Sequence, residues 1–166
     1  IGYDVMIPGN HDLDFGLDWL ISQVNGLEAD YVCANLFDTH MQLVFEPYTI
    51  KVVNGIKVAV IGLLTGAFNR LTTRSSVLDV VVKPPIKVLN SLIIQIKDMA
   101  DLIVVAYHGG ITNNPVTGEV WAYPSSEDEA YQLMEQFAEI DSLICGHQHF
   151  INAGIHPRNI ALVQPG

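Results

Sequence analysis

Residues 102–110, LIVVAYHGG, combine two features that recur along this chain. The first five residues are apolar and mostly β-branched, which predicts a buried strand, and the strand runs directly into a histidine followed by two glycines. Residues 142–149, SLICGHQH, show the same order, and residues 4–12, DVMIPGNHD, show it again. Because binding sites of sheet-and-helix proteins form at the carboxyl ends of strands, these turns indicate a site at one edge of a sheet.

Helical patterns alternate with the predicted strands. Apolar spacing and capping residues predict three helices, over residues 15–24, 85–99 and 125–137. Strands that alternate with helices indicate an α/β layered fold. A length of 166 residues fits one domain with a buried core, and we expect residues 1–166 to form a single partial domain.

A β-hairpin is predicted in the first half of the chain. Asn54-Gly55, a strong signal of a type I′ turn, separates apolar strands over residues 48–53 and 56–63. Residues 65–82 have a mixed composition and are expected to form a covering loop. Two more short strands are expected, over residues 31–34 and 160–163.

The charge balance excludes one large class of partner. The chain has a formal net charge of -10, and a surface so acidic repels the backbone of polymeric DNA or RNA. A small anionic substrate would need local positive charge, which bound metal ions can supply. No apolar run approaches the roughly 20 residues of a membrane span, so no membrane partner is expected. Cys33 and Cys145 end apolar runs and are expected to be buried free thiols.

Most of the histidines lie in turns that follow predicted strands. Neighbouring glycines let the backbone turn sharply and approach a ligand closely. Neutral imidazole commonly binds divalent metals, so this placement favours a metal site over unrelated core or surface histidines. His40 and His156 lie instead in polar connections and are expected to be solvated. The four histidines in the turns are His11, His108, His147 and His149.

Three motifs, in this order, resemble the calcineurin-like metallophosphoesterase superfamily: Gly-Asn-His-Asp at 9–12, Tyr-His-Gly at 107–109 and Gly-His-Gln-His at 146–149. The stretch 9–16, GNHDLDFG, with Ala-Asn-Leu at 34–36, is similar to the branch of 5′-nucleotidases and 2′,3′-cyclic-nucleotide 2′-phosphodiesterase/3′-nucleotidases. The resemblance runs over essentially the whole chain. It implies a layered β-sandwich flanked by helices (α-β-β-α), of which this chain holds an incomplete part.

The resemblance also implies a site with two divalent metal ions. When the ligands of the family are transferred to the matching positions of this sequence, one ion is bound by Asn10, His108 and His147, and the other by His149. Mixed nitrogen and oxygen ligands suit several metals, so Mn, Zn, Mg, Fe and Ca all remain open.

The same resemblance implies that His11 contacts the scissile phosphate rather than a metal, and that Asp14 orients His11. A carboxylate in that place fixes the tautomer of the imidazole. An alternative is that Asp14 caps the helix predicted over residues 15–24. Asp12 is expected to be a local turn residue, and Asn35 is expected to stabilise its own turn rather than bind metal.

The implied activity is hydrolysis of phosphate esters, chiefly of nucleotides, by a metal-bound water or hydroxide. The implied reactions are those of a 5′-nucleotidase or a 2′,3′-cyclic-nucleotide phosphodiesterase/3′-nucleotidase. Two alternatives remain open: a phosphoesterase for another substrate, such as a sugar diphosphate, and a non-catalytic remnant. By resemblance, the location would be secreted, cell-wall or periplasmic.

The chain also departs from the family. The family's Asp-x-His turn, and the Gly-Asp turn whose aspartate bridges the two ions, have no counterpart here. Nucleotidases also have a C-terminal domain that carries base-binding aromatic residues, and this domain has no counterpart in this chain. We therefore expect a fragment of a larger hydrolase, inactive by itself.

Overall fold

The structure is a computed structural model and describes residues 2–71, 79–123 and 125–166. Its centre is a mixed six-stranded sheet with the strand order β4-β5-β7-β8-β10-β9. The four inner strands run parallel, and β4 and β9 pair antiparallel at the two edges. The bounds are β4 Tyr48–Val53, β5 Ile56–Leu64, β7 Leu102–His108, β8 Ser142–Cys145, β9 Ile151–Ile155 and β10 Ala161–Pro165.

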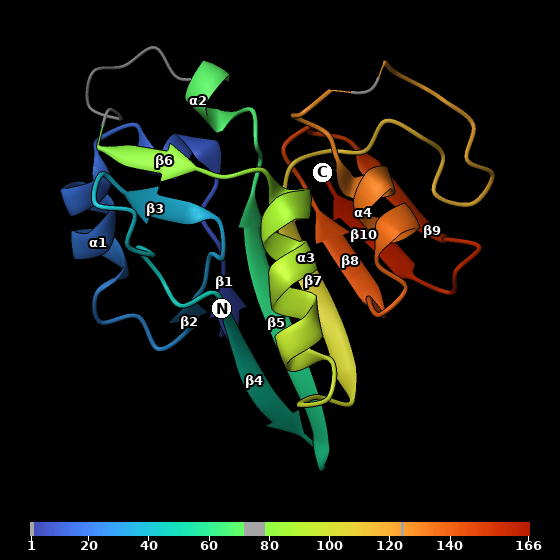
Figure 1. The fold of residues 1–166 in the computed structure, drawn as a ribbon, viewed down its shortest axis with the longest axis horizontal. Helices are drawn as coiled ribbons and strands as arrows, with labels where there is room; N and C mark the ends of the chain where they lie inside the picture. The colour runs from blue at the N-terminus through green and yellow to red at the C-terminus, as the bar shows by residue number, and fades with distance from the viewer. Residues whose placement is uncertain (1, 72–78, 124) are drawn as a thin grey trace.

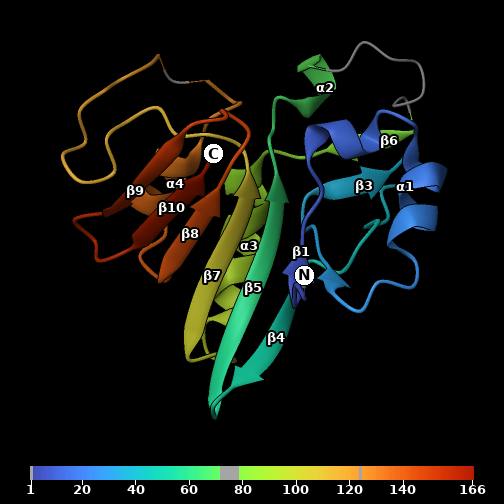
Figure 2. The same ribbon diagram turned by 180° about the vertical axis from the view of Figure 1, so that it is seen from behind.

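Helices α3 (Pro85–Ile96) and α4 (Ala130–Gln136) cover one face of this sheet (Figure 1). From behind, the strands lie in front of both helices (Figure 2). In β7, Ile103, Val105 and Tyr107 are buried in the core shared with the helices, whereas His108 is partly exposed. Since successive side chains of a strand point to opposite faces, His108 projects from the open face.

A smaller part of the chain packs beside β4 and β5 (Figure 1). Strands β1 and β2 pair parallel, and β3 and β6 pair antiparallel. A second apolar core, which includes Leu13, Leu36 and Phe68, holds this part together. Its elements are β1 Val5–Met6, η1 Asn10–Leu13, α1 Leu17–Val24, β2 Asp30–Tyr31, β3 Leu36–Asp38, α2 Phe68–Leu71 and β6 Val80–Val82. Across the described ranges, every helix is too short or too polar to cross a membrane.

The hairpin and the strand-then-turn arrangement are confirmed, and the helix expected at 85–99 forms but ends at Ile96. Asn54 and Gly55 both have positive φ, 52° and 86°, as the type I′ turn requires. The helix expected at 15–24 begins later, at Leu17, because residues 10–13 form a short 3-10 helix first. Both cysteines are free and buried, and burial raises the pKa of the Cys33 thiol to about 12.

Two expectations about irregular segments are wrong. The helix expected from Ser125 begins only at Ala130, because the backbone before it is bonded to side chains at the ends of β5 and β7. Residues 65–82 are not simply a loop, since they contain α2 and β6; residues 72–78 of that prediction lie outside the described residues. The strand expected at 31–34 is shorter and begins earlier, as β2 at Asp30–Tyr31, and strands β3 and β9 were not expected.

Candidate active site

Asn10 and His108 meet at the carboxyl end of the sheet. Asn10 begins η1 just after β1, and His108 is the last residue of β7. Their side chains lie in contact, with 2.8 Å between His108 Nε2 and Asn10 Oδ1. A Cβ atom on Gly9 would stand 3.0 Å from His108 Cε1, so glycine lets the first turn approach the ring this closely.

His147 joins this pair from the turn after β8. The ring centroids of His108 and His147 lie 5.1 Å apart, in an edge-on arrangement. His147 and His149 both have a left-handed backbone, with φ of 73° and 56°. Such conformations in residues other than glycine are unfavourable and persist where the surroundings enforce them, often at functional sites.

Two glutamines hold the His147 turn in that shape. The Gln148 side chain accepts from Ile111 N at 2.9 Å and donates to Ile111 O at 3.2 Å. Gln164, which is fully buried in β10, donates to Gly146 O at 3.1 Å. The turn is therefore tied both to the segment after β7 and to β10.

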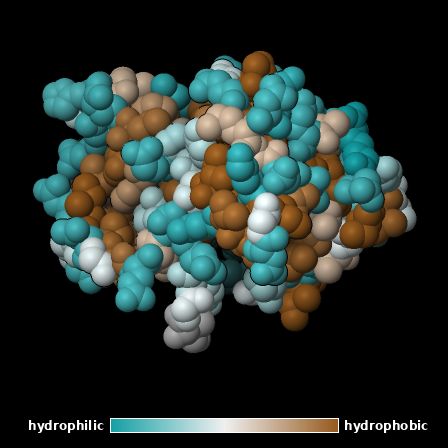
Figure 3. Space-filling model, turned by 90° about the horizontal axis from the view of Figure 1, so that it is seen from below, coloured by the Kyte–Doolittle hydropathy of each residue, from teal (hydrophilic) through white to brown (hydrophobic). Residues whose placement is uncertain are grey.

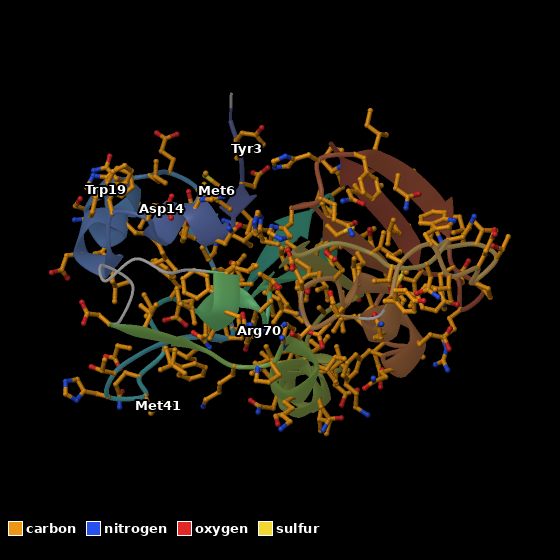
Figure 4. All side chains as sticks on the ribbon, turned by 90° about the horizontal axis from the view of Figure 1, so that it is seen from above. Tyr3, Met6, Asp14, Trp19, Met41 and Arg70 are labelled. Atoms are coloured by element: carbon orange, nitrogen blue, oxygen red, sulfur yellow. The ribbon has the colours of Figure 1, made fainter. Side chains whose placement is uncertain are left out.

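His11 and Asp14 form a separate pair on η1. His11 Nδ1 lies 3.1 Å from Asp14 Oδ2, and the His11 side chain is 83% exposed. Figure 4 shows Asp14 on the blue N-terminal segment, between the labelled Trp19 and Met6. The alternative that Asp14 caps the following helix is wrong, because the N-cap of α1 is Gly16.

The electrostatics of the site favour neutral imidazole at its centre. The pKa of His108 is lowered to about 4, chiefly by burial and secondly by the neighbouring His147. His11 and His149 act in the same direction, whereas the Asp12 carboxylate opposes the shift. The other three histidines of the turns are therefore close enough to influence His108, and a neutral ring is the form that binds a metal.

The donor set fits one divalent ion. No group of three or more His, Cys, Asp or Glu residues in the described part of the chain is arranged to hold an ion by itself. The amide oxygen of Asn10 adds a neutral third donor, since His108 lies against both Asn10 and His147. For a second ion, the predicted set offers only His149, so the fit there is incomplete.

Sequence reasoning missed Glu127. Its Oε1 lies 2.8 Å from His147 Nε2, although the two residues are far apart in the chain. Glu127 lies in the acidic run 127–129, within the helix predicted over residues 125–137, and nothing in that run marks it as a partner of His147. His156 was also misjudged: it is buried, with Nε2 2.9 Å from Glu135 Oε1. His40 is exposed, as expected.

Asp12 has the local role expected of it, whereas Asn35 bonds to distant segments and not to its own turn. Asp12 Oδ2 accepts from Gly9 N at 2.7 Å and so stabilises the first turn. Asn35 is fully buried; it donates to Leu64 O at 2.7 Å and Lys83 O at 2.8 Å, and accepts from Leu64 N at 2.8 Å. Asn35 therefore fastens the smaller core to the end of β5.

Asn35→Ala is expected to lower the free energy of unfolding by about 3 kcal/mol, because it leaves buried backbone groups of Leu64 and Lys83 unpaired. Urea unfolding followed by circular dichroism measures this. Asn25→Ala, at an exposed position, is the matched control and should change stability little. Equal stability of the two variants would show that Asn35 does not fasten the core.

Comparisons with known proteins agree in pointing to nucleotide phosphoesterases. No protein-family model matches the chain. A 5′-nucleotidase of Vibrio cholerae is 30% identical over 150 residues, which are 89% of this chain and 26% of that protein. A 2′,3′-cyclic-nucleotide 2′-phosphodiesterase/3′-nucleotidase of Salmonella typhimurium is 25% identical over 165 residues, which are 93% of this chain and 24% of that protein.

Solved structures show the same relationship. A candidate 5′-nucleotidase from Staphylococcus aureus matches with a TM-score of 0.90 and 29% identity, over 99% of this chain and 32% of that one. The calcineurin-like phosphoesterase YfkN from Bacillus subtilis matches with a TM-score of 0.77 and 25% identity, over 99% of this chain and 54% of that one. The chain spans about a quarter of the length of the curated relatives it matches. In sequence and in fold, this chain is thus a relative of the calcineurin-like phosphoesterases of the 5′-nucleotidase and cyclic-nucleotide phosphodiesterase group.

Proposed function

We propose that the protein takes part in metal-dependent hydrolysis of phosphate esters of nucleotides. The observation that carries this proposal is the contact of Asn10 with His108, with His147 beside them, at the carboxyl end of parallel strands. These three donors would hold one divalent ion, and His149 would contribute to a second. Such ions bind phosphate and lower the pKa of an attacking water.

His11 and Asp14 are proposed to act on the substrate. His11 is exposed beside the donor cluster, so a phosphate bound there can reach it. The Asp14 carboxylate, 3.1 Å from Nδ1, orients the ring so that its other nitrogen can hydrogen-bond a phosphate oxygen. Neither residue is needed to hold the ion.

A nucleotide is the proposed substrate, because the relatives in sequence are named as 5′-nucleotidases and a cyclic-nucleotide phosphodiesterase/3′-nucleotidase. A polymeric nucleic acid is not proposed as a substrate, because the net charge of -10 repels its backbone. The base would be bound by a further substrate-binding domain, since those relatives are about four times as long. A secreted, cell-wall or periplasmic location is proposed on family resemblance alone.

Chelation tests the proposed function. Excess EDTA should abolish phosphatase activity of the intact protein that contains this chain, because the attacking water would lose the ion that activates it. Mn²⁺ added after removal of the chelator should restore activity, measured with 5′-AMP and 2′,3′-cyclic AMP. Full activity in excess chelator would refute the metal-dependent mechanism. Activity on a sugar diphosphate but on neither nucleotide would favour the alternative substrate class.

A further inference from the structure

Glu127 contacts a proposed metal ligand from outside the predicted site. Its Oε1 lies 2.8 Å from His147 Nε2, and the His147 side chain is largely buried, with 14% of its surface exposed. An ionised carboxylate only accepts hydrogen bonds. Nε2 of His147 therefore carries the proton in this contact, and Nδ1 keeps the lone pair that can bind a metal.

The backbone around Glu127 is held by buried side chains. Glu127 O accepts from Thr65 Oγ1 and from Tyr107 OH, each at 3.0 Å. Both donors are almost completely buried, at the ends of β5 and β7. Asp128 Oδ1 accepts from Gly110 N at 3.0 Å, just after His108. The carboxylate is thus fixed to the same strand ends that carry the site.

The residues on either side of this stretch, Ser126 and Glu129, are also bonded to the rest of the fold. The guanidinium of Arg70, a residue of α2, donates to Ser126 Oγ. Figure 4 shows Arg70 near the middle of the molecule in the view from above. Glu129 N donates to Tyr107 OH at 3.3 Å. A side chain reaching His147 from so firmly attached a backbone is suited to fix the orientation of that ring.

We propose that Glu127 is a positioning residue that fixes the tautomer and orientation of His147, so that Nδ1 is the nitrogen offered to the ion. This rests on the proposed function, because His147 matters only if it binds a metal. Histidine ligands commonly donate their second ring N–H to a carboxylate, and loss of that partner typically costs about 10–100-fold in metal affinity.

Titration of Mn²⁺ into the metal-free intact protein, followed by calorimetry, tests the proposal. Glu127→Ala should raise the Mn²⁺ Kd by about 10–100-fold without changing thermal unfolding of the metal-free protein. Glu127→Gln keeps an acceptor oxygen and should restore most of the affinity. Glu135→Ala is the matched control, since Glu135 lies 2.9 Å from a different histidine, His156, and should leave Mn²⁺ binding unchanged.

The outcomes separate this inference from the proposed function. If His147→Ala weakens Mn²⁺ binding but Glu127→Ala does not, the positioning role is overturned and the metal site stands. If neither His147→Ala nor Glu127→Ala weakens Mn²⁺ binding, the proposed function itself fails. A crystal structure of the Mn²⁺-loaded protein should show Nδ1 of His147 on the ion and Glu127 on Nε2. Glu127 bound directly to Mn²⁺, or Nε2 as the ligand, would overturn the proposal.

Discussion

His11→Ala should lower kcat of the intact protein by about 10²–10³-fold and leave its bound metal unchanged, because the ring would no longer donate a hydrogen bond to the phosphate oxygen on which charge develops. His11 is paired with Asp14 and largely exposed, whereas the neighbouring Asn10 is in contact with His108. Asn10 and His11 are thus neighbours in the sequence, but Asn10 is proposed to bind the metal and His11 the substrate. Steady-state kinetics with 5′-AMP, together with metal analysis by mass spectrometry, measures both effects.

His147→Ala is the contrasting variant and should remove metal together with activity, since His147 lies against His108 at the centre of the donor set. His40→Ala, at an exposed position away from the strand-end turns, should leave both metal content and kcat at the level of the unaltered protein. If His11→Ala strips the metal, then His11 is itself a ligand and the division of roles proposed here is wrong.

The parts of the fold that were predictable are those with local signals. The hairpin carries its turn in two residues, Asn54-Gly55, and the strand at 102–108 carries an unbroken apolar run. Strands β3 and β6 have only three residues each and pair across more than forty residues of chain, so no local pattern marks them. Their pairing is decided by the second core, which forms only when distant segments meet.

The residues of the candidate site also divide into those with a local sequence signal and those without one. His108 and His147 stand in motifs that mark a strand end, and parallel pairing of β7 with β8 brings the two together. Glu127 has no motif of its own, because its approach to His147 depends on bonds from Thr65 and Tyr107 to the intervening backbone. His156 was expected in solvent from its polar neighbours, yet the ring of Tyr131 packs against it, with 5.3 Å between centroids.

The 166-residue chain alone is expected to associate in solution, because the two helices leave one face of its sheet open (Figure 2) and that face carries apolar side chains. Val60, Val104 and Ile144 line a cavity of about 530 Å³ on the strands, and Ile144 is 45% exposed. From below, apolar side chains also reach the surface between polar ones (Figure 3). Ile144→Lys should reduce association measured by light scattering, whereas Ile94→Lys, at an exposed position on helix α3, should reduce it less.

The same chain should turn over no phosphate ester at a measurable rate and should bind metal weakly. One ion has three candidate donors, Asn10, His108 and His147, while the other has His149 alone. Two neighbouring dications repel each other, and no residue of the chain matches the bridging carboxylate implied by the family resemblance. Assays in Mn²⁺ with p-nitrophenyl phosphate, 5′-AMP and 2′,3′-cyclic AMP, with metal analysis, measure both properties. Turnover close to that of a full-length relative, with two ions per chain, would show that the ligands have been misplaced.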